Sequence, residues 1–593
     1  MSDISIHSEK AKELSVDEEA AAAAQKKIFE ESNAGDGTHR EDHYLHGTQL
    51  WICVVALFLC MFLVALDQTI VATILQVVGN HFNAESKVAW IATGFSFSMA
   101  VFIQIWGNIS IAIGRRYCLF LAVALFEIGS LICALSNSMN MLIGGRVIAG
   151  FGGGGIQSLV MVIITEIVPI EKRPIAMSGF AVTFAIASVL GPLVGGAFTT
   201  NVSWRWCFYI NLPIGAVAAV VVFFVFHPPK PMGKILPKLK IIDWIGFFLM
   251  VSGFTLFLLA ITFGGNEFPW KSAAVILCFI LGGLLIGAFC LWNFKYSKHP
   301  LIPAEIIKVG TIDIACVGMF FVFGYFMSAI LYVSLYFQVV KGYDALDSGV
   351  SLLPTILPVV ISSMATGIAT TKTGHIKPFT ILGGLLGPLG TGLLCLLNVH
   401  SGVSQRIGCQ IVLGLSTGIM MQPFILHIQM AAPKTPGSSI IATTLFNFSR
   451  NLGAAVGSDL SQLVYTSTLS AKMAALKGTP AYYSAGLDKY DLDALINDTA
   501  QLKKLAEPAK EIVLNVFMAA FKNIFYMSIG FASIAFVSTL FMPNHRLPKK
   551  SKGVVEEKSD ESEERKDENH TADEAPAADT GVETKSTSQG NSE

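Results

Sequence analysis

The stretch LWICVVALFLCMFLVALDQTIVAT, residues 50–73, decides the fold. Its 24 residues include one formally charged side chain, Asp67, and most of the others are apolar. At about 1.5 Å of rise per residue, a helix of this length crosses the roughly 30 Å of hydrocarbon in a bilayer. The stretch therefore predicts a transmembrane helix with one carboxylate inside the membrane.

The whole chain shares this apolar character. Of its 593 residues, 53% are hydrophobic and 14% are charged, and the mean hydropathy is +0.59. Soluble globular chains carry roughly 25% charged residues. The composition argues against a soluble enzyme, a nucleic-acid binder and a secreted disulfide scaffold. The ten cysteines show no C-x-x-C spacing, so no metal or redox site is expected.

Apolar stretches of about 18 to 25 residues, each long enough to span a bilayer, recur along the chain. Membrane strands would show ten-residue alternating patterns, which the sequence lacks, so the spans are expected to be helices. The predicted fold class is an all-α polytopic membrane protein. Fourteen spans are expected, near residues 50–73, 88–109, 118–136, 141–165, 176–198, 207–226, 242–263, 272–293, 312–339, 349–370, 378–398, 405–428, 438–465 and 521–542.

The formal net charge of −1 hides an uneven distribution. Residues 1–49 and 544–593 hold 24 of the 42 acidic residues, whereas the body between them has 18 acidic and 28 basic residues. Both end segments are poor in large apolar side chains, so we expect them to be disordered tails.

Lysine and arginine in the short loops predict the orientation. If both tails are cytoplasmic, the short inner loops carry fourteen basic residues and the short outer loops carry five. The positive-inside rule then places both termini in the cytoplasm. The long loop 466–520 is expected outside, with some short amphipathic helix. Its Asn497 begins a glycosylation sequon, and Asn201 begins a second one closer to a span.

Charged side chains inside the predicted spans cost at least about 2.5–3.5 kcal/mol each, so they are functional candidates. Asp67 and Arg146 lie at similar expected depths, so an ion pair is feasible; it would either serve transport or only fix helix packing. Arg450 lies at mid-span and shares a helix face with Asn447 and Asn451.

Glu127 lies near the middle of its span without a cationic neighbour at the same depth. Burial favours the protonated form and would make the proton exchangeable near neutral pH. A permanently neutral Glu127, hydrogen-bonded to a neighbouring helix, is the alternative. Glu166, at the inner end of its span, is expected to meet Arg115 or Arg116 as a gate or packing contact.

Several motifs together resemble one known family. Leu66-Asp67-Gln68-Thr69-Ile70-Val71 matches an "LDxTIV" signature, residues 142–150 match "LxxxRxxxG" at Arg146, and residues 191–196 match "GPxxGG". With residues 204–215, these motifs resemble the fourteen-span drug:proton antiporter branch of the major facilitator superfamily in fungi. The loop motif at residues 107–116 departs from the usual pattern, because Ile111 stands where an Asp is usual.

The resemblance implies two six-helix bundles, residues 50–226 and 312–543, joined by a linker, residues 227–311, with two further transmembrane helices. A cavity is expected between the bundles near the midplane. The implied functional residues are Asp67, Glu127, Arg146 and Arg450 for proton coupling or substrate binding, Gly191, Pro192, Gly195 and Gly196 for a hinge, and Gly107, Gly114, Arg115 and Arg116 for a cytoplasmic gate loop.

The predicted function is proton-coupled export of toxic amphiphilic or cationic small molecules by alternating access, most readily at the plasma membrane. Transport of basic amino acids across a vacuolar membrane, or of siderophores, is the alternative within the family. A membrane enzyme or sensor is disfavoured, because the histidines are scattered and the C-terminal tail is short. The expected partners are a small-molecule substrate, protons and the lipid bilayer; no cofactor or nucleic acid is expected, and the protein is expected to be a monomer.

Overall fold

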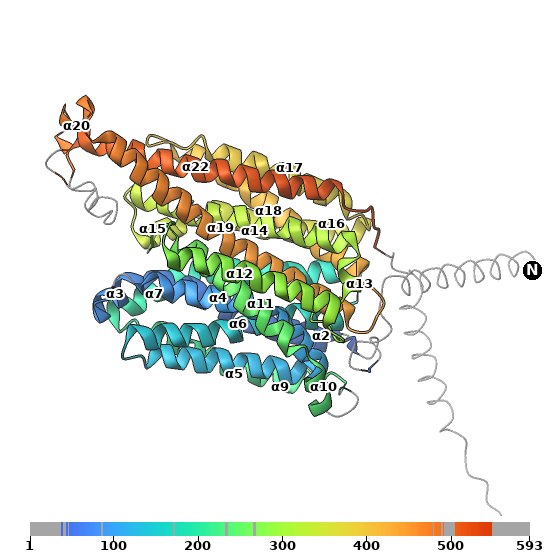
Figure 1. The fold of residues 1–593 in the computed structure, drawn as a ribbon. Coiled ribbons are helices and arrows are strands. Elements are labelled where there is room, and N and C mark those ends of the chain that lie inside the picture. Colours follow the sequence, from blue (N-terminus) through green and yellow to red (C-terminus); the bar gives the residue numbers. More distant parts are fainter. Residues whose placement is uncertain are drawn as a thin grey trace, which may run out of the picture. The chain divides into compact units, whose positions relative to one another are not determined.

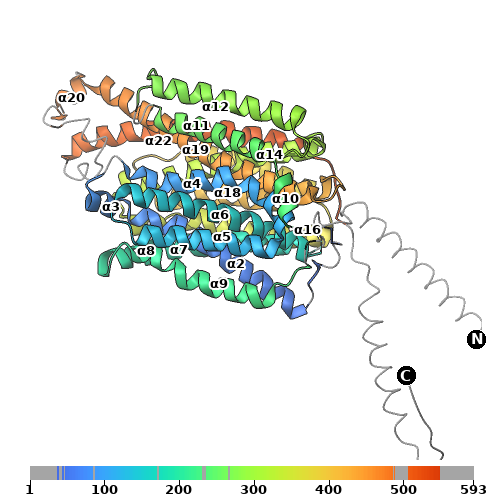
Figure 2. The same ribbon diagram turned by 60° about the horizontal axis from the view of Figure 1, so that its bottom comes forward.

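The computed structural model describes residues 37–38, 43–45, 47–84, 87–169, 172–229, 231, 235–264, 268–477, 479–484, 486–487, 490 and 505–547. Within these residues the chain is helical, and the only β-type contacts are two isolated bridges. Most of the two predicted tails lies outside the described residues, which include only 37–38, 43–45 and 47–49 of the first tail and 544–547 of the second. Figures 1 and 2 show the long helices running alongside one another, with α3 and α20 at one end and α10 at the other.

The first six predicted spans become one group of packed helices. Contacts within this group join α5 to α6, α4 to α6, and α2 to both α7 and α9. Its elements are α2 (Gly47–Ile70), η2 (Val71–Thr73), α3 (Leu75–Phe82), α4 (Ala89–Ile113), α5 (Arg115–Ala134), α6 (Met139–Ile167), α7 (Arg173–Asn201), α8 (Trp206–Tyr209) and α9 (Asn211–Val225).

The linker helices α11 and α12 follow this group. They pack mainly on each other, and α11 also contacts α4 and α19. The linker elements are α10 (Ile235–Ile241), α11 (Trp244–Phe263), α12 (Ala273–Leu291), the π-helical turn η4 (Trp292–Tyr296) and α13 (Ala304–Ile307). The last group comprises α14 (Gly310–Val339), α15 (Ala345–Val350), α16 (Leu353–Thr373), α17 (Lys377–Leu394), α18 (Val403–Ala431), α19 (Ser438–Leu476), α20 (Pro480–Ser484) and α22 (Glu507–Leu540). The exact domain boundaries stay a prediction.

All fourteen predicted spans fall on helices of the structure. Twelve helical segments of the described chain are long and apolar enough to cross a membrane. The other two predicted spans, on α17 and α19, are less apolar, because glycines dilute α17 and polar side chains interrupt α19. Since α19 packs against α14, α4, α22 and α11, it presents little of its surface to lipid and tolerates this polarity.

The predicted outer loop 466–520 is too long, because the helices on both sides of it extend further than hydropathy indicates. α19 continues to Leu476, and α22 begins at Glu507 rather than near residue 521. The extensions bury apolar side chains in the main core, including Leu469 and Met473 of α19 and Val513 and Phe517 of α22. The short helix α20 agrees with the expectation of some helix in this segment.

Both described ends of the helical body lie at the end that carries the lysine- and arginine-rich loops. The Leu45 amide donates to the carbonyl of Ile167 at the end of α6, and the Leu547 amide donates to the carbonyl of Gly374 between α16 and α17. An even number of spans requires this arrangement. Which side of the membrane this end faces stays a prediction from the positive-inside rule.

Glycines set the close approach of α5 and α6. A Cβ added to Gly145 would lie 2.7 Å from the Cys133 Sγ atom, whereas a Cβ at the adjacent Gly144 would meet open space. The two neighbouring glycines therefore differ in their packing constraint, although the sequence gives no sign of it.

We expect Gly145→Ala to destabilise the protein by about 1–3 kcal/mol, because α5 and α6 must move apart to admit the methyl group. Gly144→Ala is the matched control and should leave thermal stability unchanged or slightly raised, since alanine favours the helix. Thermal unfolding of the purified protein in detergent measures both variants. Equal stability of the two would contradict this description of the contact.

Candidate functional site

A buried ion pair joins two helices of the first group. The Arg146 Nη1 atom of α6 lies 2.5 Å from the Asp67 Oδ2 atom of α2, and the two side chains are 1% and 0% exposed. The sequence placed these residues at similar depth, and the structure brings them into contact. Because both charges are removed from water, each depends on the other for compensation.

Three more helices complete the hydrogen bonding of this pair. The Asn211 amide of α9 donates to Asp67 Oδ1 at 3.2 Å and to the Ser130 hydroxyl of α5 at 3.1 Å. Arg146 Nε donates to the Ile91 carbonyl of α4 at 2.9 Å, and the guanidinium lies 4.3 Å from the ring centroid of Phe95. One polar cluster therefore connects α2, α4, α5, α6 and α9.

The sequence analysis missed Asn211 and Ser130 as members of this cluster. Asn211 lies within the Trp204–Gly215 motif, but the motif indicated only a family pattern. A polar amide in an otherwise apolar run was the available signal, since buried polar groups need partners. Ser130 gave a weaker signal in the sequence, because serine is common in membrane helices.

Glu127 lies on α5, three residues before Ser130. Both of its carboxylate oxygens are buried and have no hydrogen-bond partner among the described residues. The carboxylate packs against Gly215 of α9, where an added Cβ would overlap it. The hydrogen bond to a neighbouring helix, which the alternative requires, is not formed among the described residues, and the role of Glu127 stays a prediction.

The predicted hinge residues lie on α7, beside the end of α2. Any Cβ at Gly191 would overlap Thr69, and one at Gly195 would lie 2.8 Å from the Ile70 Cγ1 atom. A Cβ at Gly196 would meet open space, so this glycine has no packing constraint. α7 runs through Pro192 without interruption. Gly191 and Gly195 thus hold α7 against the helix that carries Asp67, and a hinge role stays a proposal.

The predicted gate loop is mostly helical: Gly107 lies within α4, Gly114 lies between α4 and α5, and Arg115 and Arg116 begin α5. A Cβ at Gly107 would lie 2.7 Å from Thr444 of α19, and Gly114 adopts φ +100°, which favours glycine. Arg115 is the arginine that pairs with Glu166, with Nη2 and Oε1 2.8 Å apart. Arg116 instead donates to the Phe223 carbonyl of α9 at 2.6 Å.

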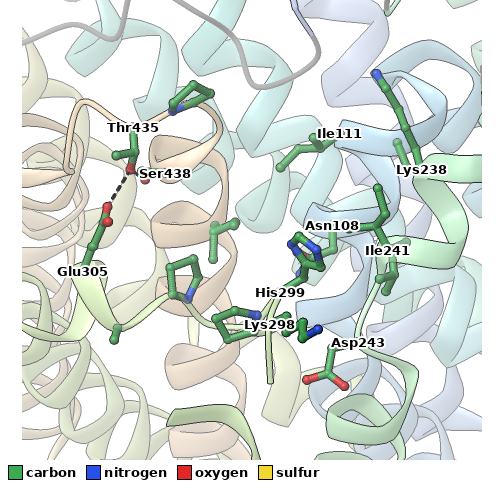
Figure 3. Close-up of a pocket in the computed structure, with 17 residues that line it drawn as sticks. Asn108, Ile111, Lys238, Ile241, Asp243, Lys298, His299, Glu305, Thr435 and Ser438 are labelled. Atoms are coloured by element: carbon green, nitrogen blue, oxygen red, sulfur yellow. Dashed lines mark hydrogen bonds between the residues drawn. The ribbon is translucent and has the colours of Figure 1, made fainter. Parts of the chain in front are cut away.

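A pocket of about 590 Å³ opens at this same end of the helices (Figure 3). Ile111, at the position of the usual Asp, lines it together with Lys238 and Asp243 of the linker and Thr435 before α19. The hydroxyl of Thr435 donates to Glu305 at 3.1 Å. Ile111 therefore presents an apolar side chain to the pocket at the position where the usual motif has a carboxylate.

The two predicted glycosylation sites have different outcomes. Asn201 is the last residue of α7; it is exposed, and its side-chain amide donates to the Ala197 carbonyl. Asn497 lies outside the described residues. Modification of either site stays a prediction.

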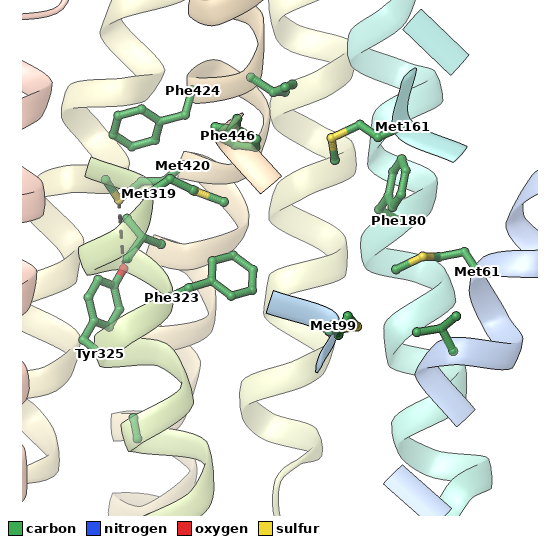
Figure 4. Packing of buried hydrophobic residues seen from close by; sticks show 14 of the residues in the cluster. Met61, Met99, Met161, Phe180, Met319, Phe323, Tyr325, Met420, Phe424 and Phe446 are labelled. Atoms are coloured by element: carbon green, nitrogen blue, oxygen red, sulfur yellow. Dashed lines mark hydrogen bonds between the residues drawn. The ribbon is translucent and has the colours of Figure 1, made fainter. Parts of the chain in front are cut away.

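The two helix groups meet across polar and soft apolar side chains. The Asn451 amide of α19 donates to Gln157 of α6 at 2.7 Å. Arg450, the fourth predicted charge, is 2% exposed and lies over the ring of Phe323 at 4.9 Å. Figure 4 shows methionine and aromatic side chains of both groups that belong to one buried cluster: Met61, Met99, Met161, Phe180, Met319, Phe323, Tyr325, Met420, Phe424 and Phe446.

Comparison with known proteins gives the family. The profile described as "Major Facilitator Superfamily" matches residues 57–458, which is more than half of the chain. The chain belongs to the major facilitator superfamily. It is therefore a transporter of small molecules and a multi-pass membrane protein, and the motifs quoted above with the relatives below identify the fungal drug:proton antiporter branch.

Two relatives from Saccharomyces cerevisiae are similar to this facilitator over most of its length. "Vacuolar basic amino acid transporter 5" is 34% identical over 550 residues, which cover 85% of this chain and 93% of its own. "Azole resistance protein 1" is 32% identical over 608 residues, which cover 92% and 98%. The structure of the human organic anion transporter MFSD10 matches with a TM-score of 0.55 over 83% of this chain and all of its own, at 14% identity, and shows the shared fold alone.

We expect Asp67→Asn to destabilise this facilitator by about 3–5 kcal/mol, because it leaves the Arg146 cation buried without its anion. Arg146→Gln should have a similar effect. The double variant should lose less than the sum, since neither charge is then left unpaired. Thermal unfolding of the four proteins in detergent measures the coupling, and purely additive losses would show that the pair contributes nothing.

Proposed function

We propose that this facilitator exports amphiphilic or cationic small molecules in exchange for protons, by alternating access. The Asp67–Arg146 pair carries the proposal, because it links helices of one bundle through a carboxylate that can take up a proton. The similarity to a protein named for azole resistance supports drug export. A proton gradient is the proposed driving force.

The pair couples protonation to helix movement in the following way. When Asp67 binds a proton, Arg146 loses its counter-ion and keeps only neutral partners among the described residues, the Ile91 carbonyl and the rings of Phe95 and Phe208. An unpaired buried cation is costly, so α2 and α6 are driven to a different arrangement. Asn211 holds the second Asp67 oxygen and thereby extends the change to α5 and α9.

Glu127 serves as a second proton carrier in this proposal. It lies one turn from Ser130, which shares the amide of Asn211 with Asp67. Because its carboxylate has no partner in this conformation, a change in its charge is not opposed by the loss of an ion pair. A proton passes between the outside and Asp67 through this carboxylate.

Alternating access uses contacts between the two bundles at both ends of the helices. Toward one end, Gly107 meets Thr444, and a Cβ at Gly367 of α16 would lie 2.7 Å from the Pro174 carbonyl oxygen of α7. Toward the other end, Phe97 and Ala455 share a hydrophobic cluster, and Pro192 faces Gly349. During transport, the contacts between the bundles at one end separate while the contacts at the other end stay formed.

The interface side chains suit substrates of varied shape. Methionine is flexible and polarisable, and methionine-rich surfaces repack around different ligands. Met61, Met99 and Met161 from the first bundle and Met319 and Met420 from the second supply such a surface. This feature favours export of many amphiphiles over transport of one compact nutrient.

Transport of basic amino acids across a vacuolar membrane is the second candidate, favoured by the 34% identity to a protein named for that activity. Siderophore transport remains the other alternative within the family. We propose the plasma membrane, with both termini cytoplasmic. Microscopy of a tagged protein, with resistance and uptake screens in deletion and overexpression strains, distinguishes the candidates: label confined to vacuoles would contradict export from the cell.

We expect Asp67→Asn and Arg146→Ala each to abolish drug resistance while the protein still inserts into the membrane. Asp67→Asn removes the carboxylate that takes up the proton, and Arg146→Ala removes the cation that this protonation would release. Resistance is measured per inserted molecule, with Lys87→Gln as the control, because Lys87 is exposed and binds Asn140 outside the ion-pair cluster. Wild-type resistance in either variant would remove the pair from the coupling mechanism.

For Glu127→Gln we expect export that no longer varies with pH in the way of the wild type, because the amide cannot exchange a proton. Transport in proteoliposomes across a series of imposed proton gradients measures this. Glu511→Gln is the control, since Glu511 is an exposed acid on α22. An unchanged response of the Glu127 variant would exclude it as a proton carrier.

A further inference from the structure

Arg450 is a buried cation without a carboxylate. Its side chain is 2% exposed, its Nε–H has no acceptor, and no acidic side chain of the described residues lies within ion-pair distance. Arg115 and Arg146 are just as buried, and each binds a carboxylate. Within the described chain, the guanidinium of Arg450 instead lies over the ring of Phe323, 4.9 Å from its centroid. Aromatic contact compensates a buried cation only in part.

Two further side chains near this level also lack partners. Both amide atoms of Asn447, one turn before Arg450 on α19, are buried without a hydrogen bond, and so are both amide atoms of Gln104 on α4. Gly107 packs on Thr444, and Phe97 clusters with Ala455, so α4 and α19 run antiparallel. Gln104 and Asn447 each lie three residues from the Gly107–Thr444 contact, toward the same end, and therefore at the same depth.

These groups lie where the two bundles meet. Asn451, the neighbour of Arg450, binds Gln157 of the first bundle at 2.7 Å. Phe323 projects from α14 toward the side where Met99 of α4 lies (Figure 4). A guanidinium and amide N–H groups from both bundles thus converge on one layer of the interface. Buried polar groups are rarely left unpaired, and a group of unpaired donors around a cation points to an anionic ligand.

We propose that Arg450, with Asn447 and Gln104, forms the subsite that binds a carboxylate of the transported molecule. A planar guanidinium matches a carboxylate with two parallel hydrogen bonds, and the amides supply further donors. The inference rests on the proposed export function, and it narrows the substrates to amphiphiles that carry a carboxylate, including zwitterions. An ester or decarboxylated analogue of the same molecule leaves the cation unpaired and binds less well.

The test compares two dyes that differ only at this group. Rhodamine 110 has a free carboxyl group, and rhodamine 123 is its methyl ester. Binding of both to the full-length protein in phosphatidylcholine nanodiscs is measured by fluorescence polarisation. Arginine and agmatine, its decarboxylated form, serve as competitors. We expect the wild type to bind each carboxylate at least about tenfold more tightly than its partner compound.

Arg450→Gln should abolish this preference while leaving binding of the ester unchanged, and Arg450→Lys should keep part of it. Arg406→Gln is the matched control, because Arg406 also lies over an aromatic ring, Phe337, but away from the interface. Equal binding of acid and ester by the wild type, binding of neither, or a preference that survives in Arg450→Gln would overturn the subsite.

Asn447→Asp tests the proposal even if removal of the arginine impairs folding. The new carboxylate sits one turn from Arg450 and should occupy its guanidinium in place of the ligand. We therefore expect higher thermal stability together with a loss of the preference for the acid; retained preference would contradict the proposal. Export is measured separately: an Arg450-dependent preference in binding without proton-driven export would refute the proposed function and leave the subsite intact.

Discussion

A charge inside a membrane is costly without a counter-ion, and the arrangement of the first bundle follows from this constraint. Asp67 and Arg146 are separated by 79 residues and lie on different helices, yet each is almost fully buried against the other. Asn211, Ser130 and the Ile91 carbonyl then fill the remaining hydrogen-bonding positions. Five helices are held by one set of polar contacts, and in the proposed mechanism a single proton on Asp67 changes the energy of that set.

Glu127 and Arg450, which form no ion pair within the described chain, are the other two residues on which the proposed function depends. The carboxylate oxygens of Glu127 and the side chain of Arg450 are buried. A protein that only needed stability would gain by replacing them with apolar residues. We propose that each group binds its partner reversibly: the Glu127 carboxylate binds a proton, and the Arg450 guanidinium binds an anionic group.

Close helix packing is what brings these side chains within reach of each other. Gly145 admits Cys133 of α5 against α6, Gly191 and Gly195 admit the end of α2 against α7, and Gly107 admits Thr444 of the second bundle. Small residues let backbones approach in lipid, where no hydrophobic force drives helices together. These glycine-lined helix faces carry few interdigitating side chains, so the helices can shift along each other. Alternating access requires such movement.

The helical fold class, the fourteen helical stretches, and the positions of Asp67, Glu127, Arg146 and Arg450 within those helices could be predicted from the sequence alone. Lipid imposes them residue by residue, because a span must be apolar along its length and any charge in it stands out. Helix ends were less accessible: α19 and α22 extend past their apolar stretches, because they pack on each other beyond the predicted spans. The partners of the charged residues were decided only by the tertiary structure. Whether Glu166 binds Arg115 or Arg116, that Asn211 joins Asp67, and that Arg450 finds no acid among the described residues all depend on the rotation of each helix about its axis. That rotation is set by packing between helices distant in the chain, which hydropathy and local spacing do not encode.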